Sequence, residues 1–79
     1  MSQQFRIVFE YETEDSAMSD VLLFADRRQA QEKFDELRSQ LILAIDPTSS
    51  QVTDEPDLYG VIDRENEAYG FVRLDALTE

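Results

Sequence analysis

The side chains of this sequence that could do chemistry are almost all carboxylates. Its 79 residues include 18 Asp and Glu but neither Cys nor His. Thiolate and imidazole chemistry is therefore excluded, and with it Ser-His and Cys-His nucleophiles, disulfides and zinc sites of the Cys/His kind. Carboxylates can act in pairs as general acid and base, bind a hard cation such as Ca²⁺, or attract positive charge on a partner.

The carboxylates gather in three clusters. Glu10, Glu12 and Glu14 stand at alternate positions, with Asp15 directly after them. On a strand, such residues share one face and lie about 6.8 Å apart along it. The other two clusters lie in polar stretches, and they comprise Asp54, Glu55, Asp57 and Asp63, Glu65, Glu67. We expect these ten residues to contact a partner.

We expect no enzymatic activity, metal or cofactor. An acid-base pair needs a cleft that gives its two carboxyl groups unequal environments, whereas these acids fall in solvent-facing segments of a small domain. The acidic loop and turn lack the spacing of an EF-hand, so only weak, adventitious Ca²⁺ binding is expected. The sequence contains no phosphate loop and no GxGxxG, which leaves nucleotide binding without support.

The net charge restricts the kind of partner. Seven Lys and Arg leave −11 at pH 7, which repels nucleic acids and anionic lipids, because proteins bind both mainly through Lys and Arg. The sequence shows no signal peptide and no apolar run long enough to span a membrane, so we expect a soluble cytoplasmic protein. With 42% hydrophobic residues the chain is too apolar for a disordered acidic tail, and its length predicts one domain, 1–79.

Hydrophobic periodicity predicts two strands followed by a helix. Residues 3–13 alternate strictly, and the apolar stretch 20–25 forms a hairpin with them. Asp26 is in position to cap a helix over 27–45, which Pro47 ends. The helix residues expected to be buried are Ala30, Phe34, Leu37, Leu41 and Ala44 or Ile45. The polar stretch 46–56 is expected to be a mobile loop.

The last third of the chain contains a short internal echo. Tyr59-Gly60-Val61-Ile62 returns as Tyr69-Gly70-Phe71-Val72, which predicts a second hairpin around residues 63–67. The two glycines mark either a bulge or a close approach by other atoms. Four phenylalanines fit core positions, and these are Phe5, Phe9, Phe34 and Phe71. The three tyrosines, Tyr11, Tyr59 and Tyr69, are less certain, because Tyr on an exposed sheet is a common anchor in interfaces.

These elements predict an α+β fold of order β-β-α-β-β. The hairpins give a four-stranded, largely antiparallel sheet with one helix packed on one face. The other face must be polar, or be covered by a second copy or a partner, and Arg6, Val8, Glu10 and Glu12 suggest that solvent reaches its first strand. A core of this size is marginal, since about 60% of the unfolded surface is buried, and a homodimer is one way to stabilise it.

The net charge is distributed unevenly. The helix segment, residues 26–45, sums to zero, whereas residues 1–25 carry −4 and residues 46–79 carry −7. All of the net charge therefore belongs to the two hairpins and the connecting loop. Two interpretations follow: a solvated surface that serves solubility, or a surface that meets a basic groove on another protein.

The chain resembles the small acidic proteins by which bacteriophages inhibit host defence, including anti-CRISPR proteins and other DNA mimics. The resemblance rests on size, element order, the clusters Glu10-Glu12-Glu14 and Asp63-Glu65-Glu67, and the lack of a catalytic motif. It implies a non-enzymatic inhibitor in the cytoplasm of a bacterial host, whose partner is a basic nucleic-acid-binding protein such as a CRISPR effector complex or nuclease. The alternative is a small dimeric regulatory or antitoxin-like module that uses its open sheet face or an edge strand.

Overall fold

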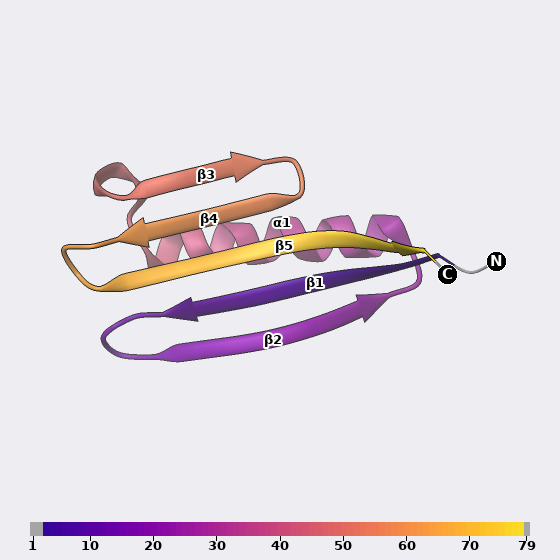
Figure 1. Ribbon diagram of the computed structural model, residues 1–79, viewed down its shortest axis with the longest axis horizontal. Helices are drawn as coiled ribbons and strands as arrows, with labels where there is room; N and C mark the ends of the chain where they lie inside the picture. The colour runs from indigo at the N-terminus through magenta and orange to yellow at the C-terminus, as the bar shows by residue number, and fades with distance from the viewer. Residues whose placement is uncertain (1–2, 79) are drawn as a thin grey trace.

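One helix and one five-stranded sheet make up the described residues, 3–78, of the computed structural model (Figure 1). The sheet order is β2-β1-β5-β4-β3, and every neighbouring pair is antiparallel. The helix runs behind the sheet in Figure 1, so the viewer looks onto the uncovered face. In chain order the elements are β1 (Gln3–Glu12), β2 (Ala17–Phe24), α1 (Arg27–Ala44), the short 3-10 helix η1 (Pro47–Ser49), β3 (Gln51–Glu55), β4 (Leu58–Asp63) and β5 (Ala68–Thr78).

The core lies between α1 and the sheet, and it confirms the α+β class and the predicted helix. The carboxylate of Asp26 accepts a hydrogen bond from the Arg28 N–H and caps α1, which ends at Ala44. Alternate residues of the strands point at the helix, because successive side chains of a strand take opposite faces. The buried side chains include Phe5, Ile7 and Phe9 of β1, Ala30, Phe34, Leu37 and Leu41 of α1, Ile45, Tyr59, Val61 and Val72.

The prediction of four strands is wrong, because residues 46–56 include a fifth. β3 pairs along its whole length with β4 at the edge of the sheet. All five of its residues are exposed, so no buried face leaves an apolar alternation in the sequence. Two contacts hold β3 in place. It pairs with β4, and Arg38 of α1 donates to its Asp54 with N···O distances of 2.6 and 3.3 Å.

The prediction that Phe71 belongs to the core is also wrong. In the second hairpin Tyr59 pairs with Val72 and Gly60 pairs with Phe71. Directly paired residues share a face, and since Tyr59 and Val72 are buried against the helix, Phe71 lies on the uncovered face. The two Tyr-Gly pairs of the echo are therefore oriented in opposite ways. Tyr59 and Gly70 face the helix, whereas Gly60 and Tyr69 face the uncovered side.

Gly70 is the glycine at which other atoms approach closely, one of the two predicted alternatives. A Cβ atom there would lie 2.6 Å from Cδ2 of Leu41 and 3.1 Å from Cβ of Tyr11. A Cβ on Gly60 would meet nothing nearer than Cβ of Phe71, at 3.8 Å. Gly70 thus lets the helix come down onto the sheet, whereas Gly60 leaves a gap on the open face.

Candidate protein-binding interface

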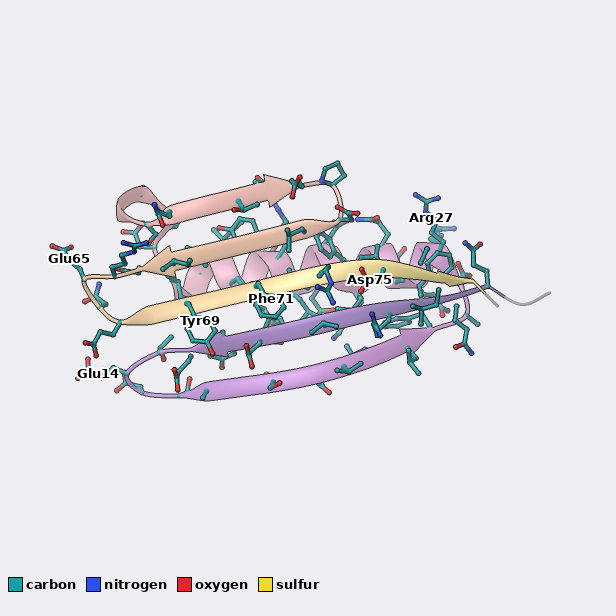
Figure 2. The ribbon with its side chains drawn as sticks, viewed as in Figure 1. Glu14, Arg27, Glu65, Tyr69, Phe71 and Asp75 are labelled. Carbon is teal, nitrogen blue, oxygen red and sulfur yellow. The ribbon has the colours of Figure 1, made fainter. Side chains whose placement is uncertain are left out.

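Two turns at one end of the molecule bring acidic side chains together. Residues 13–16 join β1 to β2 and residues 64–67 join β4 to β5, and they are neighbours because β1 pairs with β5. Figure 2 shows Glu14 and Glu65 at this end and Arg27 at the opposite end. A hollow of about 480 Å³ between the turns is lined by Glu12, Thr13, Glu14, Glu65, Asn66 and Glu67. We call Glu12, Glu14, Glu65 and Glu67 the acidic end.

The four carboxylates of the acidic end outnumber the one cation of the two turns, Arg64. Its four carboxylates are exposed, and none forms an ion pair with any other residue between 3 and 78. Arg64 belongs to the same turn as Glu65 and Glu67 and is also outside the ion pairs of the described chain. The C-terminus of α1 borders the β1–β2 turn, across a hollow lined by Ala44, Ile45 and Asp46 on the helix side. The partial negative charge of the helix terminus therefore adds to that of the carboxylates.

The β1–β2 turn has a fixed backbone that presents its acids to solvent. The Thr13 N–H donates to the carbonyl oxygen of Ser16 at 2.7 Å, and the Thr13 hydroxyl bonds the same residue at 3.2 Å. Glu14 and Asp15 lie between these two residues and are exposed. The predicted Asp15 therefore lies next to the acidic end and lines the hollow towards the C-terminus of α1.

Asp63 has a structural position. Its side chain is only 4% exposed. It accepts hydrogen bonds from the backbone N–H of Asn66 at 3.3 Å and from the Asn66 side-chain amide at 2.8 Å. These bonds close the β4–β5 turn, in which Glu67 adopts the left-handed region with φ of 52°. Asp63 holds the acidic end in shape and is not available to a partner.

The third predicted cluster is separated from the acidic end. Asp54 is on β3 and is neutralised by Arg38, whose guanidinium also lies 5.1 Å from the ring centre of Tyr59. Glu55 ends β3, and Asp57 lies in the following turn; both are exposed. The structure therefore does not combine the ten predicted residues into one surface.

Asp46 is an acidic residue near the acidic end that sequence reasoning did not select. It caps η1 by accepting hydrogen bonds from the Thr48 N–H at 2.9 Å and the Thr48 hydroxyl at 2.7 Å. The backbone hydrogen bond first, and then the hydroxyl, lower the pKa of the Asp46 carboxyl. Its place beside Asp15 depends on how α1 crosses the sheet, which no local pattern reveals.

The uncovered face of the sheet is partly apolar. Val21 and Leu23 of β2 are 57% and 62% exposed, and Ile62 of β4 is 48% exposed. A shallow groove of about 890 Å³ crosses β3, β4 and β5, with Gly60, Ile62, Tyr69 and Phe71 in its lining. Figure 2 shows Tyr69, Phe71 and Asp75 in sequence along β5 on this face. The groove exists where Gly60 supplies no side chain.

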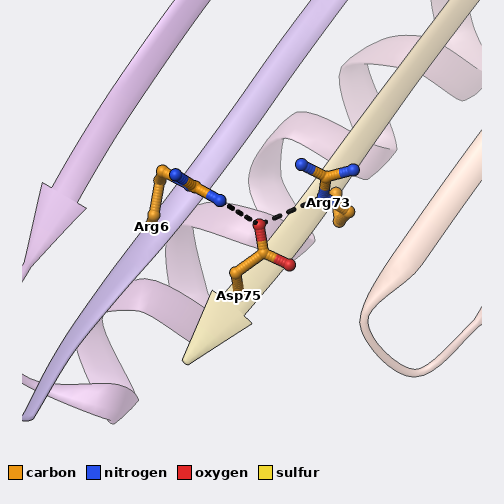
Figure 3. A network of polar contacts seen from close by, with 3 residues as sticks. All are labelled: Arg6, Arg73 and Asp75. Atoms are coloured by element: carbon orange, nitrogen blue, oxygen red, sulfur yellow. Dashed lines mark hydrogen bonds and ion pairs between the residues drawn. The ribbon is translucent and has the colours of Figure 1, made fainter. Parts of the chain in front are cut away.

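Charge divides the uncovered face into two halves. Glu10 and Glu12 pair directly with Phe71 and Tyr69 across β1 and β5. Burial against the sheet, and then the charges of Glu10 and Glu12, raise the pKa of Tyr69. Towards the other end of the same strands, Arg6 and Arg73 both donate to one oxygen of Asp75, at 3.0 and 3.1 Å (Figure 3). Two cations on one carboxylate make this cluster positive, and Glu55 at the β3 edge of the same face brings this half to zero net charge.

The described residues contain neither a group of side chains placed to hold a metal ion nor a helix that could span a membrane. No group of three or more Asp and Glu within residues 3–78 is arranged to hold a metal ion. The helix in that part of the chain is not long and apolar enough to cross a bilayer. The acidic end therefore offers an anionic surface without a coordinating cage.

Comparisons with protein-family models, curated proteins and solved structures returned no match for this chain.

Proposed function

We propose that this protein is a non-enzymatic binding protein whose acidic end occupies a basic surface of another protein, at a site that otherwise binds nucleic acid. The observation that carries the proposal is the meeting of four exposed carboxylates from two turns, without an ion pair among the described residues. Like charges held this close oppose folding. A positively charged partner relieves that repulsion on binding, which favours fast and selective association.

The proposed partner belongs to the class that phage inhibitors of host defence target. Carboxylates on a rigid turn compete with phosphates for the same Lys and Arg side chains. A CRISPR effector complex or a nuclease in the cytoplasm of a bacterial host presents such a groove. The protein then acts as an anti-CRISPR or DNA-mimic inhibitor, without a catalytic step of its own.

Capture from a bacterial lysate at low salt tests the proposal. Immobilised protein should retain nucleic-acid-binding proteins, and both added duplex DNA and increasing salt should release them, because the contacts are between charges. A variant with Glu12→Gln, Glu14→Gln, Glu65→Gln and Glu67→Gln should lose this retention. The matched control removes the same number of carboxylates elsewhere, by Glu32→Gln, Asp35→Asn, Glu55→Gln and Asp57→Asn. Equal retention by the two variants would contradict the proposal.

The second candidate function is a small dimeric regulatory or antitoxin-like module. The apolar residues and groove of the uncovered sheet face favour it. In this case the acidity serves solubility, and both charge variants behave alike in the capture experiment.

A further inference from the structure

We propose that the uncovered sheet face binds a second copy of this chain, with the two sheets stacked face to face and their strands antiparallel. This proposal specifies the dimer of the second candidate function, and Glu12 is the one residue that it shares with the acidic end. The argument begins with the apolar side chains exposed on one face, because monomeric proteins rarely leave a broad apolar patch in water. Leu23, Val21, Val8, Phe71, Tyr69 and Ile62 cross the sheet from β2 to β4 on this face.

The edges of the sheet are poor alternatives for self-association. On β2 the Val21 N–H donates to the carboxylate of Asp20 at 2.9 Å, so this N–H is not free to pair with another strand. On β3 the edge is a strand of only five residues, which carries Glu55 next to the Asp54–Arg38 ion pair. Acidic side chains on an edge strand block pairing with another strand, and two copies of either edge would bring like charges together. The face is therefore the surface left for a second copy.

The charge pattern of the face is self-complementary in one orientation. Successive residues on this face of β1 are Arg6, Val8, Glu10 and Glu12, so the strand is positive at one end and negative at the other. A two-fold axis that lies midway between the two sheets and runs perpendicular to the strands places each strand over the same strand of the other copy, in the opposite direction. Arg6 of one copy then lies over Glu12 of the other, as an isologous interface requires.

The same axis fixes the facing residues of the other rows, and it places Val8 over the methylene groups of Glu10 and Asp75 over the hydroxyl of Tyr69. Arg73 of one copy falls over Phe71 of the other, where a guanidinium and an aromatic ring attract each other. Leu58 falls over Gly60, where the groove leaves space for its side chain. The axis also sends the two acidic ends to opposite ends of the dimer, whereas parallel stacking would place them side by side and is opposed by their charge.

The area is sufficient for a stable pair. The described chain measures 46 × 21 × 18 Å, and the sheet occupies its broad side, which is 46 Å long and 21 Å wide (Figure 1). A standard interface buries about 800 Å² per partner, which is about one-seventh of the 5529 Å² that the monomer exposes. One broad face of a small flat domain supplies this area.

Sedimentation velocity of the full chain over a wide concentration range at physiological salt tests the proposal. We expect a species of twice the 9.2 kDa chain mass. Val8→Glu, whose new carboxylate would lie over Glu10 of the second copy, and, on another strand, Val21→Glu should shift the protein to monomer. The matched control is Leu43→Glu, which adds the same charge at an apolar residue of α1 that is 88% exposed and off the sheet. It should leave the dimer intact, and circular dichroism melts establish that each variant is folded.

A charge exchange tests the orientation. Arg6→Glu and Glu12→Arg should each raise the dimer dissociation constant about tenfold, and the double variant should return it to within a few-fold of the parent. Within one copy these residues are about 20 Å apart on one strand, so the rescue must come from the second copy. A parent chain that is monomeric at all concentrations, or a double variant no better than the single ones, would overturn the proposal. A monomer leaves the face to a different partner and leaves the acidic-end function untouched.

Discussion

A Cβ atom on Gly70 would lie 2.6 Å from Cδ2 of Leu41, so α1 rests on the sheet where β5 has no side chain. Replacing Gly70 by Ala must displace Leu41 or the strand, and overpacking of this kind costs about 1–3 kcal/mol. Gly60→Ala is the control, because its Cβ would be in ordinary contact at 3.8 Å. It should be neutral or stabilising by about 0.5 kcal/mol, since Gly weakens a strand interior. Urea unfolding measures both, and equal midpoints would contradict this packing.

These two glycines also show how far the sequence could be interpreted. Each follows a Tyr and precedes apolar residues, and local pattern predicted the hairpin but not which glycine meets the helix. That choice depends on the register of β4 with β5, which puts Tyr59 in the core and Phe71 outside it. Strong local periodicity predicted β1 and α1, whereas β3 has no buried residue and could not be recognised.

Asp54 ties β3 to the helix through Arg38, with two hydrogen bonds at 2.6 and 3.3 Å. Asp54→Asn should release this edge strand and accelerate amide hydrogen exchange in β3 more than in β1. The change in the free energy of unfolding should be about 0.5–1 kcal/mol, because the pair is partly exposed. Glu55→Gln, on the same strand and without an ion pair among the described residues, is the control. Unchanged exchange in the Asp54 variant would show that strand pairing alone holds β3.

Tyr69 reports the negative half of the uncovered face. Burial against the sheet and the charges of Glu10 and Glu12 raise its pKa above the usual 10.0. A group whose pKa is raised on folding contributes stability that is complete below its unfolded pKa and is lost as the pH rises through the folded one. Glu10→Gln with Glu12→Gln should therefore lower the pKa of Tyr69, followed by NMR of the ring carbons above pH 9.

The internal control in that titration is Tyr59. Burial raises its pKa first, against the opposing charge of Arg38, so replacing Glu10 and Glu12 should leave it unchanged. Equal shifts at both tyrosines would indicate a change of fold rather than a local charge effect.

Asp63 should be required for stability, in contrast to its acidic neighbours. Asp63→Ala removes both acceptors of the Asn66 bonds, which a buried carboxylate makes to an exposed turn, and the expected cost is about 1–3 kcal/mol. Glu65→Ala, two residues on and exposed, should cost nothing. Thermal unfolding compares the two, and an Asp63 variant as stable as the parent would show that other contacts hold the turn.

The contrast between these acids explains why the candidate site was only partly predictable. Sequence spacing grouped Asp63 with Glu65 and Glu67, although burial separates their roles. It also grouped Glu10, Glu12 and Glu14 on one strand face, whereas β1 ends at Glu12 and Glu14 lies in the turn. The meeting of two distant turns follows from the pairing of β1 with β5, a non-local contact that no local pattern encodes.

Neutralising the acidic end should make the protein more stable while it weakens capture of basic proteins. The four carboxylates repel one another in the folded state and are further apart in the unfolded chain, so their removal relieves a cost of folding. In low salt the variant with Glu12→Gln, Glu14→Gln, Glu65→Gln and Glu67→Gln should melt a few degrees above the parent. The gap should close as salt rises, because the Debye length falls from about 30 Å at 0.01 M to about 3 Å at 1 M. The control variant at residues 32, 35, 55 and 57 should gain less, since Glu32 there pairs with Arg28. A lower melting temperature for the acidic-end variant would show that these carboxylates hold the turns together instead of straining them.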